Sequence, residues 1–127
     1  MLSVNTEYRN GIMFVRLKGY LNKNTIEKLD KKVTNVIDKM GIRNIVLNVT
    51  DLKQIDCKGI NKLYYNYELC KKNDGTILLC GNNSKIESIL KKSRILKYIN
   101  EITDELCAIK IINKGWLYGW DKYVTYK

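Results

Sequence analysis

The fold of this chain is decided by residues 44–60, which read NIVLNVTDLKQIDCKGI. Residues 44–49 form an apolar run rich in β-branched side chains, which is typical of a strand buried in a parallel sheet. Apolar side chains return at helical spacing from residue 60, so Asp56-Cys57-Lys58-Gly59 is predicted to join a strand to a helix. The N-terminal end of a helix stabilises anions and makes thiols more acidic. We therefore expect the functional site in this loop.

Two strands and one helix are predicted upstream. Residues 3–8 and 12–17 read as strands, and Asn10-Gly11 between them is a signal for a hairpin turn. The segment Asn24-Thr25-Ile26-Glu27 has the form of a capping box, with Asn24 as N-cap of a helix that ends at Gly41. The residues expected on the inner face of this helix are Ile26, Leu29, Val33, Val36, Ile37 and Met40.

Helices and strands continue to alternate downstream. A second capping box, Ser84-Lys85-Ile86-Glu87, is predicted to open a helix. The helix after residue 59 is expected to point Ile60, Leu63, Tyr67 and Cys70 inward, and a strand at 76–80 follows it. The next helix is expected to point Ile86, Ile89 and Leu90 inward. After it we expect an amphipathic piece at 93–99, an edge strand near 99–102 and a helix at 104–112. Such alternation indicates right-handed crossovers and a parallel core. The prediction is an α/β domain with a mixed sheet, in which the N-terminal hairpin is antiparallel.

The composition fits one globular domain that acts without metal or cofactor. The chain has 127 residues, is 45% hydrophobic, and contains four cysteines but no histidine. The cysteines form no C-x-x-C pair, so we expect no metal site and no disulfide, and Cys70, Cys80 and Cys107 are expected to act as small apolar residues. Without histidine there is no Ser-His-Asp or Cys-His catalysis, and we expect no enzyme and no catalytic residue. No apolar stretch reaches the roughly 18 residues that span a bilayer, and no signal peptide is evident, so the expected location is the cytoplasm.

The net charge of +10 raises nucleic-acid binding as an alternative. The lysines are scattered through every segment, however, and cluster only modestly at Lys91-Lys92-Ser93-Arg94. A nucleic-acid surface concentrates positive charge on one face. A basic nucleic-acid-binding domain is therefore kept only as a rival interpretation.

Residues 113–127 form an aromatic and basic extension to the domain at 1–112. Both tryptophans of the chain, Trp116 and Trp120, lie in this extension among tyrosines and lysines. Three interpretations stay open: an extra strand that covers a sheet edge, a segment that binds a partner, or a membrane-interface anchor.

From Ser3 to Ile112 the order of elements and several local sequences resemble the STAS domain family. The landmarks are VRLKGYLN at 15–22, NIVLNVTDL at 44–52, IDCKGI at 55–60 and SRILKYI at 93–99. The chain looks most like the small bacterial anti-sigma factor antagonists. The resemblance implies a four- to five-stranded sheet with about four helices, packed mainly on one side.

The resemblance also implies a function for the loop at 56–59. In the family this loop reads Asp-Ser-Ser-Gly or Asp-Ser-Thr-Gly, and the residue after the aspartate accepts phosphate from a serine kinase that is also the anti-sigma factor. The unphosphorylated antagonist binds this kinase and frees the sigma factor. A phosphate adds about −1.5 to −2 of charge to the contact surface, which prevents binding.

This chain departs from the family pattern at three positions. Cys57 stands where the acceptor serine is expected, Lys58 replaces the second hydroxyl residue, and Asn22 stands where an acid commonly follows Gly-x-Leu. A thiol is not a normal substrate of a serine kinase, so we expect no phosphoswitch at residue 57. The residues predicted to bind a partner are Asp56, Cys57, Lys58, Gly59, Asn61, Lys62 and Asn22. Of these, Lys58, Asn61 and Lys62 are expected to be exposed on the first turns of the helix.

Three roles remain open for such a protein. In the first, the chain binds a kinase-like anti-sigma factor, or another partner of STAS domains, without being switched, and Cys57 fills the small niche of the serine. In the second, Cys57 is a redox sensor whose oxidation mimics phosphorylation. In the third, the chain is a scaffold or accessory subunit of a larger complex. Asp56 is expected to cap the helix as well as contact a partner, and Gly59 is expected to serve either backbone geometry or close helix packing.

Overall fold

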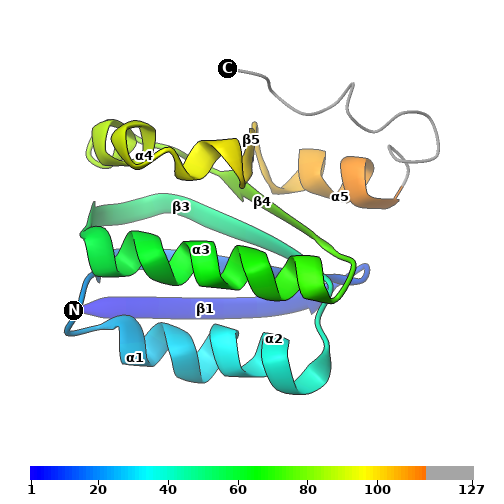
Figure 1. Cartoon of the computed structure of the whole chain (residues 1–127). Helices are drawn as coiled ribbons and strands as arrows, with labels where there is room; N and C mark the ends of the chain where they lie inside the picture. Colours follow the sequence, from blue (N-terminus) through cyan, green and yellow to red (C-terminus); the bar gives the residue numbers. More distant parts are fainter. Residues whose placement is uncertain (114–127) are drawn as a thin grey trace.

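The computed structural model describes residues 1–113 and contains a five-stranded sheet in the order β1-β2-β3-β4-β5 (Figure 1). The first two strands, β1 (Leu2–Arg9) and β2 (Ile12–Leu21), form an antiparallel hairpin. The others, β3 (Asn44–Ile55), β4 (Thr76–Cys80) and β5 (Asn100–Ile102), run parallel to β2 and to one another. The predicted mixed sheet with an antiparallel N-terminal hairpin is confirmed.

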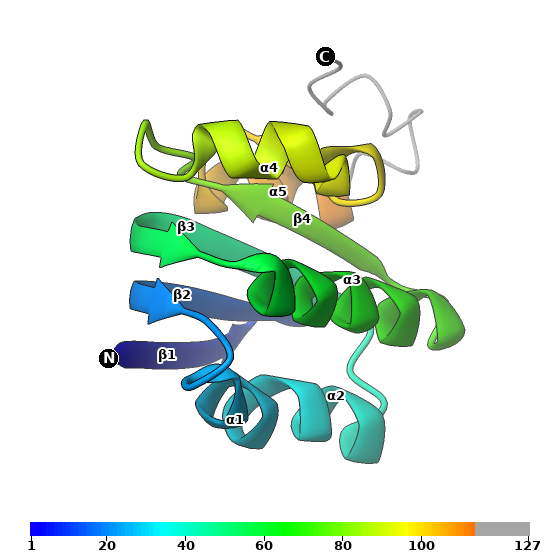
Figure 2. The same cartoon turned by 60° about the vertical axis from the view of Figure 1, so that its left-hand side comes forward.

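Helices cover both faces of this sheet. The helical segments are α1 (Ile26–Leu29), the π-helical turn η1 (Asp30–Thr34), α2 (Asn35–Met40), α3 (Cys57–Lys72), α4 (Glu87–Ser93), the 3₁₀ turn η2 (Ile95–Lys97) and α5 (Glu105–Asn113). The segments from α1 to η2 pack on one face, and α5 packs on the other (Figure 2). The expected packing mainly on one side is therefore confirmed, with α5 as the exception.

Two apolar clusters correspond to these two faces. The larger cluster lies under the helices of the first face and includes Leu47 of β3 and Leu63 of α3, both fully buried. The smaller one joins Phe14 of β2 to Ala108 and Ile111 of α5. Cys70 and Cys80 are buried as small apolar residues, which confirms their predicted role, and Cys107 is half-buried. No helix within residues 1–113 is long and apolar enough to cross a membrane.

Both predicted capping boxes are wrong. Asn24 is not the N-cap of α1 and Ser84 is not that of α4. The turn that leads into each helix instead begins at an asparagine before the predicted cap. The side-chain oxygen of Asn22 accepts a hydrogen bond from the backbone N–H of Asn24, and that of Asn83 accepts one from the backbone N–H of Lys85, both at 2.9 Å. Asparagine readily closes such local turns, because its short side chain reaches the backbone two residues on.

The helix predicted from residue 26 to Gly41 is also more irregular than expected. Its middle turn, η1, is π-helical, and it divides the segment into α1 and α2. Gly41 ends α2 in the left-handed conformation, with φ of 63°, as predicted. Met40, which we expected on the inner face, is 72% exposed because it is the last helical residue before Gly41 turns the chain away. The aromatic and basic extension lies outside the described residues except for Asn113.

Candidate protein-binding site

The parallel pairing of β2 and β3 brings the two loops of the site together. Leu21 pairs with Ile55 at the carboxyl ends of these strands. The loop that begins at Asn22 and the loop that begins at Asp56 therefore leave the sheet side by side. Loops at the carboxyl edge of parallel strands are the usual location of binding sites in α/β folds.

Asp56 ties these two loops together. Its Oδ1 accepts a hydrogen bond from the backbone N–H of Gly59 at 2.8 Å, which makes Asp56 the N-cap of α3, as predicted. Its Oδ2 accepts from the backbone N–H of Lys23 at 3.1 Å, and its own N–H donates to the carbonyl of Leu21 at 3.1 Å. One carboxylate thus satisfies donors from both loops and fixes the start of α3 against the end of β2.

Gly59 permits this close approach. A Cβ built at residue 59 would lie 2.8 Å from the backbone oxygen of Leu21 and 2.8 Å from Cγ1 of Ile55. The first of these atoms belongs to the backbone, so it cannot rotate away. Of the two roles expected for Gly59, the structure supports close helix packing, at the contact of α3 with the end of β2.

Cys57 is the first residue of α3, and its side chain is exposed. Lys58 and Asn61 are exposed as well, as predicted. At about 100° per residue, Cys57 and Asn61 share one side of the helix, while Lys58 lies at its flank. Together they form a solvent-facing surface on the first turns of α3, above the loop that Asp56 holds in place.

Lys62 is not the exposed residue that we expected. It is half-buried, and its Nζ forms an ion pair with Oδ1 of Asp30 at 3.0 Å. The same ammonium lies 5.5 Å from the centre of the Tyr65 ring. Lys62 therefore joins α3 to η1, because Asp30 belongs to the turn that packs beside the helix.

Asn22 lies close to the predicted loop, but its Oδ1 and its backbone N–H are used within its own turn. Its Oδ1 accepts from the N–H of Asn24, and its N–H donates to Oγ1 of Thr25 at 2.9 Å. Thr25 in turn donates to the carbonyl of Tyr20 at 2.8 Å. Asn22 thus shapes the loop beside Asp56, and Thr25 is a supporting residue that sequence reasoning missed.

A buried polar pair behind the site was also missed. Oγ1 of Thr34 donates to Oδ1 of Asn66 at 2.9 Å, and Asn66 is fully buried. Thr34 ends η1, and Asn66 lies in the middle of α3, so this bond is a second tie between the two segments. Neither residue type marks a core position in the sequence, because both are more often exposed.

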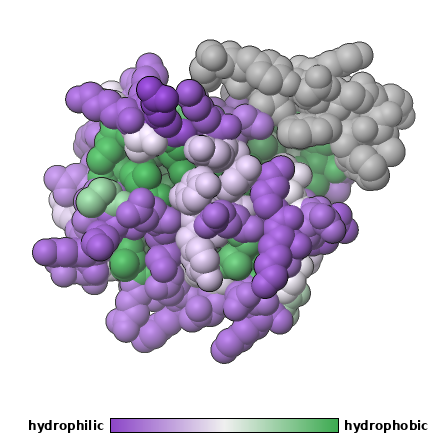
Figure 3. Space-filling model, in the orientation of Figure 1, coloured by the Kyte–Doolittle hydropathy of each residue, from purple (hydrophilic) through white to green (hydrophobic). Residues whose placement is uncertain are grey.

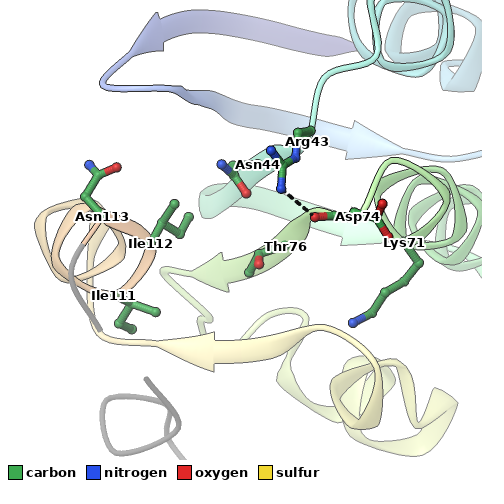
Figure 4. Close-up of a pocket in the computed structure, with 8 residues that line it drawn as sticks. All are labelled: Arg43, Asn44, Lys71, Asp74, Thr76, Ile111, Ile112 and Asn113. Atoms are coloured by element: carbon green, nitrogen blue, oxygen red, sulfur yellow. Dashed lines mark hydrogen bonds between the residues drawn. The ribbon is translucent and has the colours of Figure 1, made fainter. Parts of the chain in front are cut away.

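The described residues contain no group of three or more His, Cys, Asp or Glu side chains that could hold a metal ion. A pocket of about 490 Å³ lies at the opposite end of the parallel strands, between the beginnings of β3 and β4 and the end of α5 (Figure 4). The hydrogen bond drawn between two of its lining residues runs from Nη2 of Arg43 to the carbonyl of Asp74 at 3.0 Å. This pocket shares no residue with the Asp56 loop.

Comparisons with known proteins identify relatives of this domain. The sequence profile of the STAS domain matches residues 3–108. The anti-sigma F factor antagonist of Paenibacillus polymyxa is 26% identical over 108 residues, which cover 85% of this chain and 92% of the relative.

Solved structures show the same fold. An anti-sigma factor antagonist from Mycobacterium paratuberculosis superposes with a TM-score of 0.79 at 14% identity, over 90% of this chain and 96% of the other. The Bacillus cell fate determinant SpoIIAA in its phosphorylated form gives 0.68 at 16% identity, over 86% of this chain and 99% of the other.

Proposed function

This chain belongs to the STAS domain family, and we propose that it is an anti-sigma factor antagonist that binds its partner through the start of α3. The proposed surface consists of the loop at 56–59 and the exposed residues of the first turns of α3. The observation that carries the proposal is the double clamp by Asp56, which holds this loop rigidly while Cys57 and Lys58 remain exposed. Its support from known proteins is the named function of the Paenibacillus polymyxa relative.

The partner that fits this proposal is an anti-sigma factor with a kinase-like ATPase fold. Cys57 occupies the position from which the family's serine would accept phosphate, so the chain would bind this partner without being switched off by it. The thiol is close to serine in size and is uncharged when protonated. A contact surface built for a small neutral side chain would therefore accept it, whereas a carboxylate at the same position would carry the charge that phosphorylation adds.

A pull-down from the source cell tests the proposal. The baits are the wild-type chain, Cys57→Ser, Cys57→Asp and a control, Asn35→Asp, which adds the same charge on an exposed position of α2. Mass spectrometry identifies the captured proteins. We expect wild type, Cys57→Ser and Asn35→Asp to capture an anti-sigma factor and Cys57→Asp to lose it.

Three other results would point to the remaining roles. If all four baits capture the same proteins, residue 57 lies outside the contact, and this result favours the role as a scaffold or accessory subunit. If treatment of the wild type with peroxide abolishes capture while Cys57→Ser resists it, the exposed thiol is a redox switch. If nuclease treatment removes everything that is captured, the chain binds nucleic acid and the proposal fails.

A further inference from the structure

Three tyrosine rings form a cluster where α3 meets the end of η2. Tyr64 and Tyr98 pack edge to face, with ring centres 5.0 Å apart at an interplanar angle of 81°. Tyr67 completes the group, 5.7 Å from Tyr64 and 5.5 Å from Tyr98. Tyr98 is 47% exposed, and the other two are half-buried against the apolar core. The cluster is therefore packed against the apolar core on its inner side and exposed to solvent on its outer side.

This tyrosine cluster continues the surface proposed for the partner. Tyr64 follows Cys57 by seven residues, which corresponds to about two helical turns and about 10 Å along the same side of α3. Asn61 lies between them on that side. Figure 3 shows pale side chains of intermediate hydropathy in the middle of the face on which α3 lies, with hydrophilic side chains and smaller apolar patches beside them. A partner seated on Cys57 would reach the cluster without leaving this face.

The charge around the cluster is mainly positive. Lys71 lies with its Nζ 5.8 Å from the centre of the Tyr67 ring, and Lys97 immediately precedes Tyr98. Both lysines are exposed, and within residues 1–113 neither takes part in an ion pair. Glu68 is the opposing carboxylate on this side of α3. A tyrosine hydroxyl is protonated at neutral pH and donates hydrogen bonds, and desolvation, aided by Glu68, raises the pKa of Tyr64 further.

We propose that the tyrosine cluster and its flanking lysines, Lys71 and Lys97, bind an acidic segment of a protein partner that carries an apolar or aromatic anchor. Tyrosine is one of the side chains enriched in the energetic centres of protein interfaces, and the two lysines supply positive charge that complements an acidic segment. Carboxylates of the partner would pair with the ammonium groups and accept hydrogen bonds from the tyrosine hydroxyls. The anchor would pack on the exposed part of Tyr98.

A protein segment fits this surface better than a nucleic acid. Single-stranded nucleic acids bind to basic grooves in which aromatic rings present their faces to successive bases. Here Tyr64 and Tyr98 pack edge to face at 81°, and Tyr67 is tilted by 60° to Tyr98 and by 31° to Tyr64. The three rings are therefore turned against one another and form no series of parallel slots for bases.

Fluorescence anisotropy with defined probes tests this inference. The probes are a labelled peptide of Asp and Glu residues around two Phe residues, its Asn and Gln counterpart, and a short single-stranded DNA. The proteins are the full wild-type chain, Tyr98→Ala and Lys97→Glu. Their matched controls are Tyr8→Ala on β1, where the tyrosine is 64% exposed, and Lys39→Glu on α2, where the lysine is exposed.

We expect the acidic peptide to bind wild type. Its affinity should fall by about tenfold for Tyr98→Ala and for Lys97→Glu, as it does when an interface loses an anchor residue. The two controls should bind it as wild type does, and the uncharged peptide should bind weakly to all. The inference is overturned if the acidic peptide does not bind, if all variants bind it equally, or if the DNA binds more tightly and depends on the same residues.

The inference rests on the proposed function for the identity of the partner, but the two fail separately. Binding of a purified anti-sigma factor to wild type and Cys57→Asp reports on the proposed function. Binding of the acidic peptide to Tyr98→Ala reports on the tyrosine cluster. If Cys57→Asp abolishes binding of the anti-sigma factor while Tyr98→Ala leaves the affinity for the peptide unchanged, only the inference is wrong. If the peptide depends on Tyr98 and the anti-sigma factor never binds, only the proposed function is wrong.

Discussion

Substitution of Asp56 should separate the two loops of the candidate site and measure how strongly they are held. In Asp56→Ala both acceptor oxygens are lost, so the backbone N–H groups of Gly59 and Lys23 lose their partners. Loss of an N-cap costs about 1 kcal/mol, and a typical hydrogen bond contributes about 1 kcal/mol. We therefore expect Asp56→Ala to lower the free energy of unfolding by about 2 kcal/mol.

Asp56→Asn divides this effect into its two parts. Its Oδ1 still accepts from Gly59, but its amide nitrogen cannot accept from the N–H of Lys23, so the expected loss is about 1 kcal/mol. Asp104→Ala is the matched control. Asp104 caps α5 through one bond, from the N–H of Cys107 at 2.8 Å, and should also cost about 1 kcal/mol.

Urea denaturation of the full chain, followed by circular dichroism, measures these free energies, and thermal unfolding supplies a second reading. For a domain of this size about 1 kcal/mol corresponds to a shift of about 4 °C in Tm. The expected order of destabilisation is Asp56→Ala above Asp56→Asn and Asp104→Ala. If Asp56→Ala costs no more than Asp104→Ala, the bond to Lys23 contributes nothing and the double clamp is refuted.

Three further substitutions test other parts of the structure. Gly59→Ala places a Cβ 2.8 Å from a backbone oxygen of β2 and should cost about 1–3 kcal/mol in urea denaturation; a neutral effect would contradict the close contact. Hydrogen bonds from Arg16 hold the pKa of Glu105 below its usual value, so Glu105 adds stability above its unfolded pKa, and this is lost as the pH falls through its folded pKa. Glu105→Gln should therefore lower stability at pH 7 by about 1.5 kcal/mol and flatten the acid side of the stability curve, whereas an unchanged acid side would show that the pair is unimportant. Thr34→Val should cost about 1–3 kcal/mol because it leaves the buried Asn66 amide without its bond, and adding Asn66→Leu should restore most of this loss; additive losses in the double variant would argue against the pair.

Local signals were sufficient to predict the sheet, most helices and the cap at Asp56. The hairpin turn at Asn10-Gly11 and the β-branched strand at 44–49 carry their information within a few residues. Asp56 stands immediately before a helix, where an acidic side chain reaches backbone N–H groups three residues on. Such short-range chemistry can be read directly from a sequence.

The contacts that complete the site were not predictable, because they join segments that are far apart in the chain. The ion pair of Lys62 with Asp30 depends on the packing of η1 beside α3, and the tyrosine cluster depends on where η2 places Tyr98. The π-helical turn has no signature in the apolar pattern. Periodicity reports which side of a helix is buried, but it does not report which neighbouring segment covers that side.

The most direct test of the account is the affinity of purified wild type and Cys57→Asp for a purified anti-sigma factor from the source organism, measured by calorimetry. We expect wild type to bind and Cys57→Asp to bind at least about tenfold more weakly, because the new carboxylate introduces negative charge at the contact. Asn35→Asp should match wild type, which would exclude a general effect of charge. Equal affinities for wild type and Cys57→Asp would contradict the central claim that the partner sits on the start of α3.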